Sequence, residues 1–321
     1  MRKPDEAGLL ELIAADGRPL LQCTALALLF SGAFALFLSI RREFLPHDVA
    51  FLGMTPAQLC AVGDCRVVAF MFHDRVAFGG VLIAIAVLYL WLSTVPLAAG
   101  AAWAWWTILV SGAIGFLSFL SYLGYGYLDR WHGVGSAFLA PLFAAGVVRS
   151  RALVRGRPVG SAGAVFRALG RRGRLGQAAL VATGLGMLLA GATILLVGMT
   201  RVFVPQDLAF MGLTVADLRA VNPRLLPLIT HDRAGLGGGL FCCGSVVTAC
   251  ALFARPSRSL RQALALAGLA GFGAAIGVHV VVGYTDALHL APAVAGAALF
   301  VVGLVLVSER RPREEETRWH R

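Results

Sequence analysis

Long apolar stretches constrain the fold of this chain more than any other feature of its sequence. The segments 20–40 and 178–200 contain no charged residue. In the hydrocarbon core of a bilayer, a segment of about 20 residues must satisfy its backbone hydrogen bonds internally, so it folds as an α-helix. The pattern predicts eight transmembrane helices, at about 20–40, 67–92, 101–125, 133–149, 178–200, 225–254, 262–284 and 289–307.

The composition agrees with an all-α polytopic membrane protein. Hydrophobic residues make up 58% of the 321 residues and charged residues only 14%, against roughly 25% charged residues in soluble domains. The net charge of +11 does not indicate nucleic acid, because no basic stretch is interleaved with aromatic residues that could stack on bases. A soluble enzyme and a secreted disulfide scaffold are excluded.

Basic residues predict the orientation of the helices. An even number of spans puts both tails on one side, and the tails with the three connections on that side hold 19 of the 28 Lys and Arg residues. Under the positive-inside rule, both termini are cytoplasmic. The acidic N-terminal segment before Leu20 does not resemble a cleavable signal peptide. We expect a multi-pass protein of the inner (plasma) membrane, with the lipid bilayer as its main partner.

Three sequence blocks occur twice, in the same order and with a shift of 157 to 159 residues. Such spacing is strong evidence for an internal duplication. With four spans in each half, the two repeats are predicted to be parallel and related by a pseudo-twofold axis along the membrane normal. All blocks then lie on the extracytoplasmic side. The pairs are 44–55 with 203–214, 73–75 with 231–233, and 126–132 with 283–289.

The duplication divides the chain into five parts. An Arg- and Gly-rich cytoplasmic linker separates the two four-helix repeats, and the charged C-terminal end has the composition of a disordered tail. The predicted parts are the N-terminal cytoplasmic segment 1–19, the first repeat 20–149, the linker 150–177, the second repeat 178–307 and the tail 308–321.

The second block contains three adjacent ionisable residues, His73, Asp74 and Arg75. Ionisable groups at the mouth of a helix bundle are costly when they face lipid, so they should face the interior or one another. One interpretation is an ion-pair lattice of the Asp74 to Arg75 type that holds the helix mouths together. The other is a catalytic site, for which the candidates are Asp74, Asp232, Arg75 and Arg233.

The third block pairs an aspartate with a histidine three positions later, which puts both side chains on one face of a helix. Histidine nitrogens and carboxylate oxygens suit zinc or a similar divalent ion, and a haem between symmetry-related histidines is the less favoured alternative. The repeated Asp48 and Asp207 are interpreted as loop anchors, His279 as a core histidine, and Tyr127 and Tyr284 as interfacial belt residues. The candidate metal ligands are His73, His231, Asp129, His132, Asp286 and His289.

Two further features have structural interpretations. The glycine pairs 79–80 and 237–238 are predicted to mark the crossing of the second and sixth spans, because small residues allow close helix packing in lipid. Cys60 and Cys65 lie in a predicted extracytoplasmic loop, where a disulfide persists.

Three functions remain open at this point. The first is a metal-dependent enzyme that acts on a lipid or another membrane-soluble substrate. The second is a structural or partner-binding membrane protein, and the third is an ion- or proton-coupled carrier. Carriers place coupling residues near the bilayer midplane, whereas nearly all ionisable residues here lie at the outer mouth of the spans. This depth disfavours the carrier.

Overall fold

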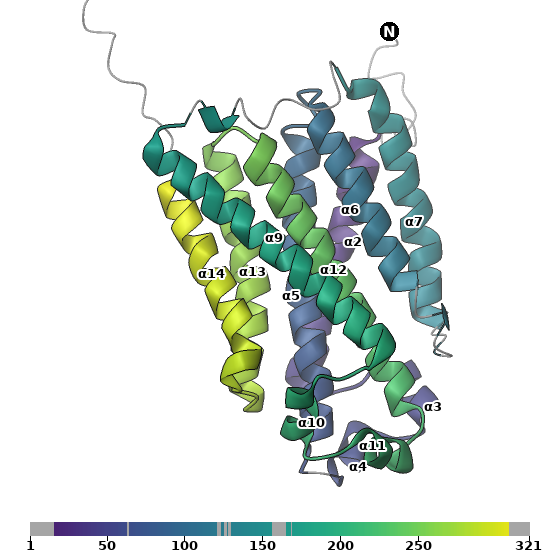
Figure 1. Ribbon diagram of the computed structural model, residues 1–321. Helices are drawn as coiled ribbons and strands as arrows, with labels where there is room; N and C mark the ends of the chain where they lie inside the picture. Colours follow the sequence, from purple (N-terminus) through teal and green to yellow (C-terminus); the bar gives the residue numbers. More distant parts are fainter. Residues whose placement is uncertain are drawn as a thin grey trace, which may run out of the picture.

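A computed structural model describes residues 16–62, 64–120, 123–124, 127, 130–155, 165–167 and 169–307, without the side chains of 130–132. Residues 1–15 of the predicted N-terminal segment, the predicted tail 308–321 and residues 156–164 and 168 of the linker lie outside these ranges. Within them, eight helices are long and apolar enough to cross a membrane. The prediction of an all-helical polytopic membrane protein is confirmed (Figure 1).

The eight long helices follow the predicted spans closely, with one clear exception. The fifth begins within the predicted linker, because its arginine-rich first turn continues the helix beyond the apolar run. The helices are α2 (Arg18–Arg41), α5 (Arg66–Thr94), α6 (Ala102–Leu120), α7 (Arg130–Ser150), α9 (Arg171–Thr200), α12 (Leu225–Phe253), α13 (Arg258–Val282) and α14 (Ala287–Leu306).

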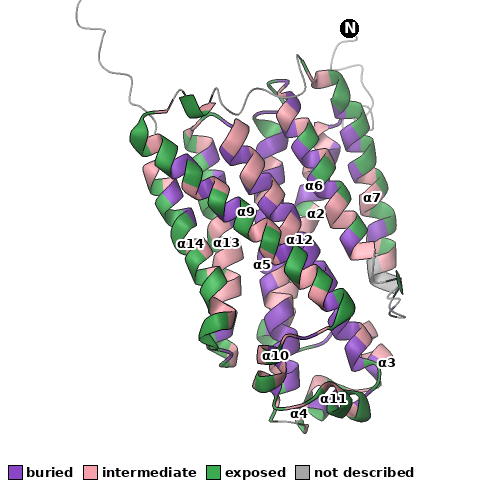
Figure 2. Ribbon diagram, in the orientation of Figure 1, coloured by how far each residue is buried: buried purple, intermediate pink, exposed green. Residues whose placement is uncertain are grey.

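Helices α5 and α12 form the centre of the bundle and are its most buried spans (Figure 2). Helix α5 packs against α2, α13 and α12, whereas α12 packs against α9, α6 and α5. The outer helices complete the bundle, with α7 against α2 and α14 against α9 and α13. Each central helix therefore contacts helices from both halves of the chain.

The glycine pairs do allow close helix packing, but not between α5 and α12. Gly79 lies against α2 and Gly80 against α13, whereas Gly237 lies against α9 and Gly238 against α6. The prediction that these pairs mark the α5–α12 crossing is wrong. A helical face carries glycines at a spacing of three or four, so adjacent glycines necessarily point toward different neighbours.

Two other glycines mark the contact between α12 and α5. Gly235 and Gly239, four residues apart on one face of α12, lie against Phe78 of α5. The absence of a side chain at both positions makes room for the phenylalanine ring in the centre of the bundle.

Four short helices form a layer at one end of the bundle, opposite the start of α2 and the end of α14 (Figure 1). They are α3 (Pro46–Leu52), α4 (Pro56–Cys60), α10 (Pro205–Met211) and α11 (Val215–Val221). Gly53 and Gly212 end α3 and α10 with φ of +66° and +67°, a conformation that glycine adopts without strain. Thr55 and Thr214 then cap α4 and α11.

A disulfide links Cys60 to Cys65, between the end of α4 and the start of α5. The prediction of this bond is confirmed. It closes a short loop directly before α5, so it fixes where this central helix begins. The remaining cysteines of the described residues are free.

Candidate functional site

The repeated polar residues lie near one end of the two central helices. Helix α5 has 29 residues, which at 1.5 Å per residue gives about 43 Å, more than the ~30 Å hydrocarbon core of a bilayer. His73 lies about 31 Å along the helix from Thr94. The motif His73-Asp74-Arg75, which recurs as His231-Asp232-Arg233 and which we call the HDR motif, therefore lies about one hydrocarbon-core thickness from Thr94, next to the layer of short helices.

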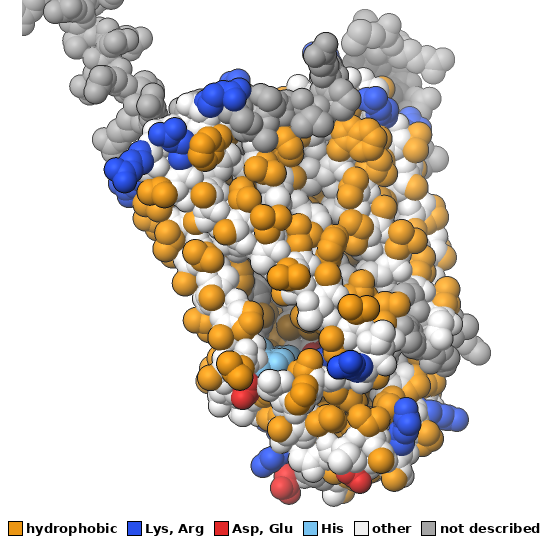
Figure 3. Space-filling view, viewed as in Figure 1, with side chains coloured by type: hydrophobic (Ala, Val, Ile, Leu, Met, Phe, Trp, Pro, Cys, Tyr) orange, Lys and Arg blue, Asp and Glu red, His pale blue; other side chains and the backbone are white. Residues whose placement is uncertain are grey.

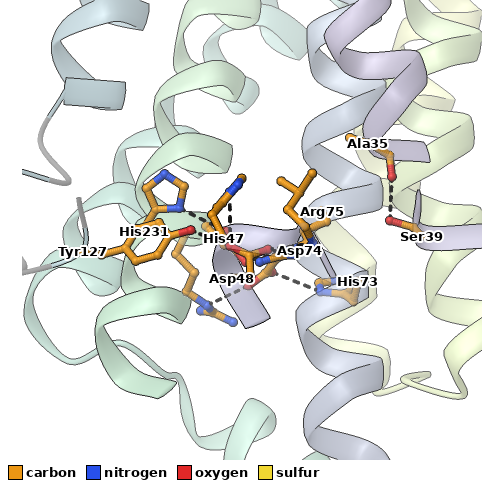
Figure 4. A network of polar contacts seen from close by, with 12 residues as sticks. Ala35, Ser39, His47, Asp48, His73, Asp74, Arg75, Tyr127 and His231 are labelled. Carbon is orange, nitrogen blue, oxygen red and sulfur yellow. Dashed lines mark hydrogen bonds and ion pairs between the residues drawn. The ribbon is translucent and has the colours of Figure 1, made fainter. Parts of the chain in front are cut away.

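Arg75 joins the two halves of the protein through two carboxylates. Its Nη1 donates to Oδ2 of Asp48 in α3 at 2.7 Å, and its Nε donates to Oδ2 of Asp232 in α12 at 2.8 Å. The guanidinium also lies over the ring of Phe44, 5.2 Å from its centroid. Figure 4 shows Asp48 between Arg75 on one side and Tyr127 on the other.

Arg233 makes the corresponding contacts in the opposite direction. Its Nη2 lies 2.8 Å from Oδ2 of Asp207 in α10, and its Nε lies 3.3 Å from Oδ2 of Asp74 in α5. The second contact is an ion pair whose angle is too poor for a hydrogen bond. The guanidinium lies over Phe203, 5.9 Å from the ring centroid.

An ion-pair lattice is thus present, but its partners differ from the predicted ones. Arg75 bonds Asp48 and Asp232 rather than its neighbour Asp74. Each arginine contacts one aspartate on a short helix of its own half of the chain. It also contacts the HDR aspartate of the other half. We call these six residues the crossed ion-pair network: Asp48, Asp74, Arg75, Asp207, Asp232 and Arg233.

Two tyrosines complete this network. The Tyr127 hydroxyl donates to Oδ1 of Asp48, and the Tyr284 hydroxyl donates to Oδ1 of Asp207 at 2.8 Å. Both side chains are only 1% exposed, so their interpretation as belt residues is wrong. The two aspartates do anchor their loops as predicted, since Asp48 accepts from the Leu45 backbone N–H and Asp207 from that of Val204.

The crossed ion-pair network has more negative than positive groups. With its four carboxyls ionised, it carries a formal charge of −2, and Asp74 and Asp207 are almost fully buried. Buried charge without compensation costs several kcal/mol. The surroundings of the network therefore favour a cation, either as protonated histidine or as a bound ion.

Three histidines meet directly beside Asp74, and we call them the three-histidine cluster: His73 of α5, His279 of α13 and His289 of α14. One potential ligand atom from each lies within 4.8 Å of the other two. The His73 and His279 Nε2 atoms are 3.0 Å apart. Both of these side chains are buried. His279, which was interpreted from the sequence as a core histidine, is the central member of the cluster.

Hydrogen bonds at the other ring nitrogens assign the tautomers. The His73 Nδ1 lies 3.2 Å from Oδ1 of Asp74, and the His279 Nδ1 contacts the carbonyl oxygen of Ala275. Both partners only accept, so both Nδ1 atoms carry the proton. In the neutral imidazoles, two Nε2 lone pairs then face each other.

The tautomer of His289 is assigned in the same way, from the contact of its Nδ1 with Tyr284. Its Nδ1 lies 3.2 Å from the Tyr284 oxygen, whose only proton is already donated to Asp207. Burial and the neighbouring Asp207 raise the pKa of Tyr284 well above its usual range, so the hydroxyl stays protonated. The His289 Nδ1 is therefore a donor, and its Nε2 is left as the third lone pair.

The HDR motif of the second half has different surroundings. The His231 Nδ1 lies 3.1 Å from Oδ1 of Asp232, as His73 does from Asp74. Its ring packs against aromatic side chains, 4.9 Å from the Tyr127 ring and 6.0 Å from that of Phe119. The structure therefore does not group His231 with the three-histidine cluster.

The other candidate ligands divide into two groups. Asp286 accepts a hydrogen bond from the His289 backbone N–H at 2.8 Å and caps α14, and it is not grouped with the three histidines. Asp129 and the side chain of His132 lie outside the described residues. His279 was missed because its counterpart in the first half is Tyr122, so repetition of the motif could not mark it.

A pocket of about 540 Å³ lies beside the cluster. Tyr284, which contacts His289, forms part of its wall. Figure 3 shows a hollow in this apolar flank of the molecule with a histidine at its floor. The remaining lining comes from α10 and from the turn between α13 and α14: Pro205, Gln206, Ala209, Phe210, Gly283, Thr285 and Asp286.

Similarity to known proteins does not assign this site. No protein-family model, no curated protein and no solved structure matches the chain. The geometry of the site therefore carries the functional argument, within the class of integral membrane proteins that the eight apolar helices define.

Proposed function

We propose that this integral membrane protein binds a divalent transition metal of the zinc class at His73, His279 and His289, and uses it to act on a membrane-soluble substrate. One observation carries the proposal. The Nδ1 of each of the three imidazoles has a hydrogen-bonding partner, and one potential ligand atom of each lies within 4.8 Å of the other two. This outer hydrogen bonding is typical of metal-ligating histidines.

The distances and charges support zinc over haem. In a tetrahedral site with Zn–N of ~2.0–2.1 Å, two ligand nitrogens are about 3.3 Å apart, close to the 3.0 Å between the His73 and His279 Nε2 atoms. A haem would need a porphyrin between these two imidazoles. A divalent ion also offsets the formal −2 of the crossed ion-pair network.

Three protein nitrogens leave one position of a tetrahedral ion open, as in catalytic rather than structural zinc sites. This feature favours an enzyme over a structural role. We assign the predicted catalytic residues Asp74, Asp232, Arg75 and Arg233 to positioning: Asp74 orients His73, and Arg233 holds Asp74. The pocket beside Tyr284 gives the substrate its access.

The proposal includes two parallel repeats, 20–149 and 178–307, related by a pseudo-twofold axis between α5 and α12. Reciprocal contacts support it. Arg66 donates to the carbonyl oxygen of Phe210 at 3.3 Å, and its counterpart Arg224 donates to that of Phe51 at 2.7 Å. The crossed ion pairs of Arg75 and Arg233 have the same reciprocity.

We further propose that the layer of short helices is extracytoplasmic and that both termini and the 150–177 linker are cytoplasmic. The excess of Lys and Arg on the side of the termini and the linker, 19 of the 28 in the sequence, supports the orientation. Impermeant thiol labelling of single cysteines introduced at 160 and 214, in a chain without its free cysteines, tests it. Labelling at 214 alone is expected, and labelling at 160 from outside would reverse the orientation.

Metal analysis of the purified full chain tests the site. We expect about one zinc per chain after dialysis against micromolar zinc, and a loss of at least 90% in His279→Gln and His289→Gln. His47→Gln and His231→Gln are matched controls, because both histidines lie outside the cluster. A zinc content of the folded wild type no higher than the background, or an equal loss of zinc in His231→Gln, would reject the three-histidine site.

A purely structural network makes a different prediction. In that case His279→Gln lowers the unfolding temperature, and added zinc changes the unfolding temperature of neither protein. A metal site predicts that zinc raises the unfolding temperature of the wild type and of His231→Gln but not of His279→Gln. The comparison of plus and minus zinc within each variant separates the two functions even where a substitution is destabilising.

A further inference from the structure

The pocket beside the three-histidine cluster has polar and apolar boundaries. Its polar groups are the Gln206 amide, the Thr285 hydroxyl and the Asp286 carboxylate, and the last two residues are exposed. Phe210 and Tyr284 stack with ring centroids 4.5 Å apart and form an aromatic wall. The volume of about 540 Å³ lies within the ~300–1,000 Å³ typical of ligand pockets.

The helices next to this pocket present large apolar side chains to the outside. Val280 and Val281 at the end of α13 are 68% and 78% exposed, and Leu288 at the start of α14 is 76% exposed. Such side chains on a membrane protein face lipid. The polar α13–α14 turn lies directly between them, so the pocket opens where the apolar belt meets the polar boundary.

The charges of the lining select among lipid headgroups. No Lys or Arg lines the pocket, and its charged residue is Asp286. A carboxylate repels phosphate and accepts hydrogen bonds from hydroxyl groups. Lipid phosphates, in contrast, are bound by basic pockets. The lining therefore suits an uncharged headgroup with hydroxyl groups and an apolar tail.

We propose that this pocket binds the hydroxyl-bearing, uncharged headgroup of a membrane lipid, such as a glycolipid, while its acyl chains lie against α13 and α14. This inference rests on the proposed function, because the lipid bound in the pocket is proposed as the substrate of the metal site. Tyr284 connects the two: it belongs to the pocket lining, and its ring stacks on that of His289 with the ring centroids 4.4 Å apart. The headgroup then lies one side chain away from the His289 ligand.

Native mass spectrometry of the full chain in an uncharged polyoxyethylene detergent tests the binding. We expect one monoglucosyl diacylglycerol to be retained per chain, at least tenfold more strongly than phosphatidylglycerol. Ala209→Trp, which fills the pocket from α10, should abolish the retention. Ala216→Trp in the exposed part of α11, outside the lining, is the matched control and should retain the lipid.

Asp286→Asn separates charge from shape, because asparagine also caps a helix. It should reduce the preference for the glycolipid over phosphatidylglycerol at least threefold without changing the zinc content. An unchanged preference would overturn the role of the carboxylate. Equal retention of both lipids by the wild type, or retention by Ala209→Trp, would overturn the proposal. Competition by free glucose at millimolar concentration would show a water-soluble ligand and also overturn it.

The metal and the lipid can fail separately in this design. His279→Gln should lose zinc and still retain the glycolipid, since its side chain does not line the pocket. A wild type that binds the lipid without any zinc rejects the proposed metal function and leaves the lipid site. A wild type that binds zinc without lipid selectivity rejects the lipid site and leaves the proposed metal function.

Discussion

The two copies of the HDR motif have the same sequence and different surroundings. In both, the arginine joins two aspartates from different halves of the chain, and the histidine Nδ1 contacts the neighbouring carboxylate. Beyond that shared part, His73 faces two further histidines, whereas His231 packs against Tyr127 and Phe119. The contacts common to both copies hold the halves together, and the contacts of His73 alone form the proposed metal site.

This difference separates two kinds of constraint. The crossed ion-pair network needs both halves, since each arginine depends on an aspartate from the other half. The three-histidine cluster needs only one HDR histidine, together with two residues of α13 and α14. The proposed metal site and the proposed repeat therefore rest on different residues.

The largest effect is expected from Arg233→Met, which leaves two buried aspartates without their cation. Breaking a buried ion pair on one side costs about 3–5 kcal/mol. The cost for Arg75→Met should be smaller, because the Arg75 side chain is 14% exposed and that of Arg233 only 6%. Unfolding of the purified chain in mixed detergent micelles measures both free energies.

A compensating variant tests the reason for this loss. Asp74→Asn and Asp207→Asn together with Arg233→Met remove the uncompensated charge, so this triple variant should recover about half of the lost free energy. Without recovery, the loss would come from packing of the guanidinium on Phe70 and Phe203 rather than from charge.

His279→Tyr is expected to have the second largest effect, and only when zinc is present. The substitution introduces the residue that the first half has at the matching sequence position, Tyr122. At a zinc concentration of about 100 times Kd, binding adds ~2.7 kcal/mol to the free energy of unfolding. This increment should vanish in His279→Tyr and persist in His231→Tyr, as measured by unfolding with zinc and with a chelator.

Much of the fold could be predicted because it follows from local rules. Apolar length identifies transmembrane helices, and proline, glycine and threonine at fixed positions identify the short helices. Several residues that the sequence repeats, such as Asp48, Arg75 and Tyr127, belong to the crossed ion-pair network or contact it. Repetition therefore located the part of the site that both halves share.

The partners within the site could not be predicted, because they depend on how helices from the two halves cross. No local pattern pairs Arg75 with Asp232, 157 residues away. The prediction from the glycine pairs was wrong for the same reason. Small residues indicate that a helix is packed closely, but they do not identify the neighbouring helix. His279 has no repeated counterpart, so the residue that makes the cluster asymmetric was the one that a search for symmetry could not find.

The disulfide gives a smaller contrast between the two halves. Cys60 and Cys65 are linked before α5, while the second half has Arg219 and Arg224 near the corresponding places before α12. Closing a loop of about six residues stabilises a chain by ~2 kcal/mol in the chain-entropy model. Cys60→Ser with Cys65→Ser should lower the free energy of unfolding by about this amount. Intact mass before and after reduction confirms the bond, and an unchanged wild-type mass would contradict it.

The smallest expected effect is a pH-dependent difference between α4 and α11. Both helices begin with a threonine cap, but its partner is Gln58 in α4 and Asp217 in α11. The hydrogen bonds from Thr214 lower the pKa of Asp217 below its ordinary value of 3.8. A carboxyl with a lowered pKa stabilises its helix above the ordinary pKa, and this stabilisation is lost as pH falls through the lowered value.

Hydrogen exchange of the Thr214 and Thr55 amides at pH 5 and pH 2.5, corrected for intrinsic rates, compares the two caps within one molecule. The Thr214 amide should lose protection several-fold more than the Thr55 amide at the lower pH, and Gln58→Glu should make the Thr55 amide acid-sensitive as well. Equal loss at both caps would mean that acid loosens the whole layer of short helices and not the α11 cap alone.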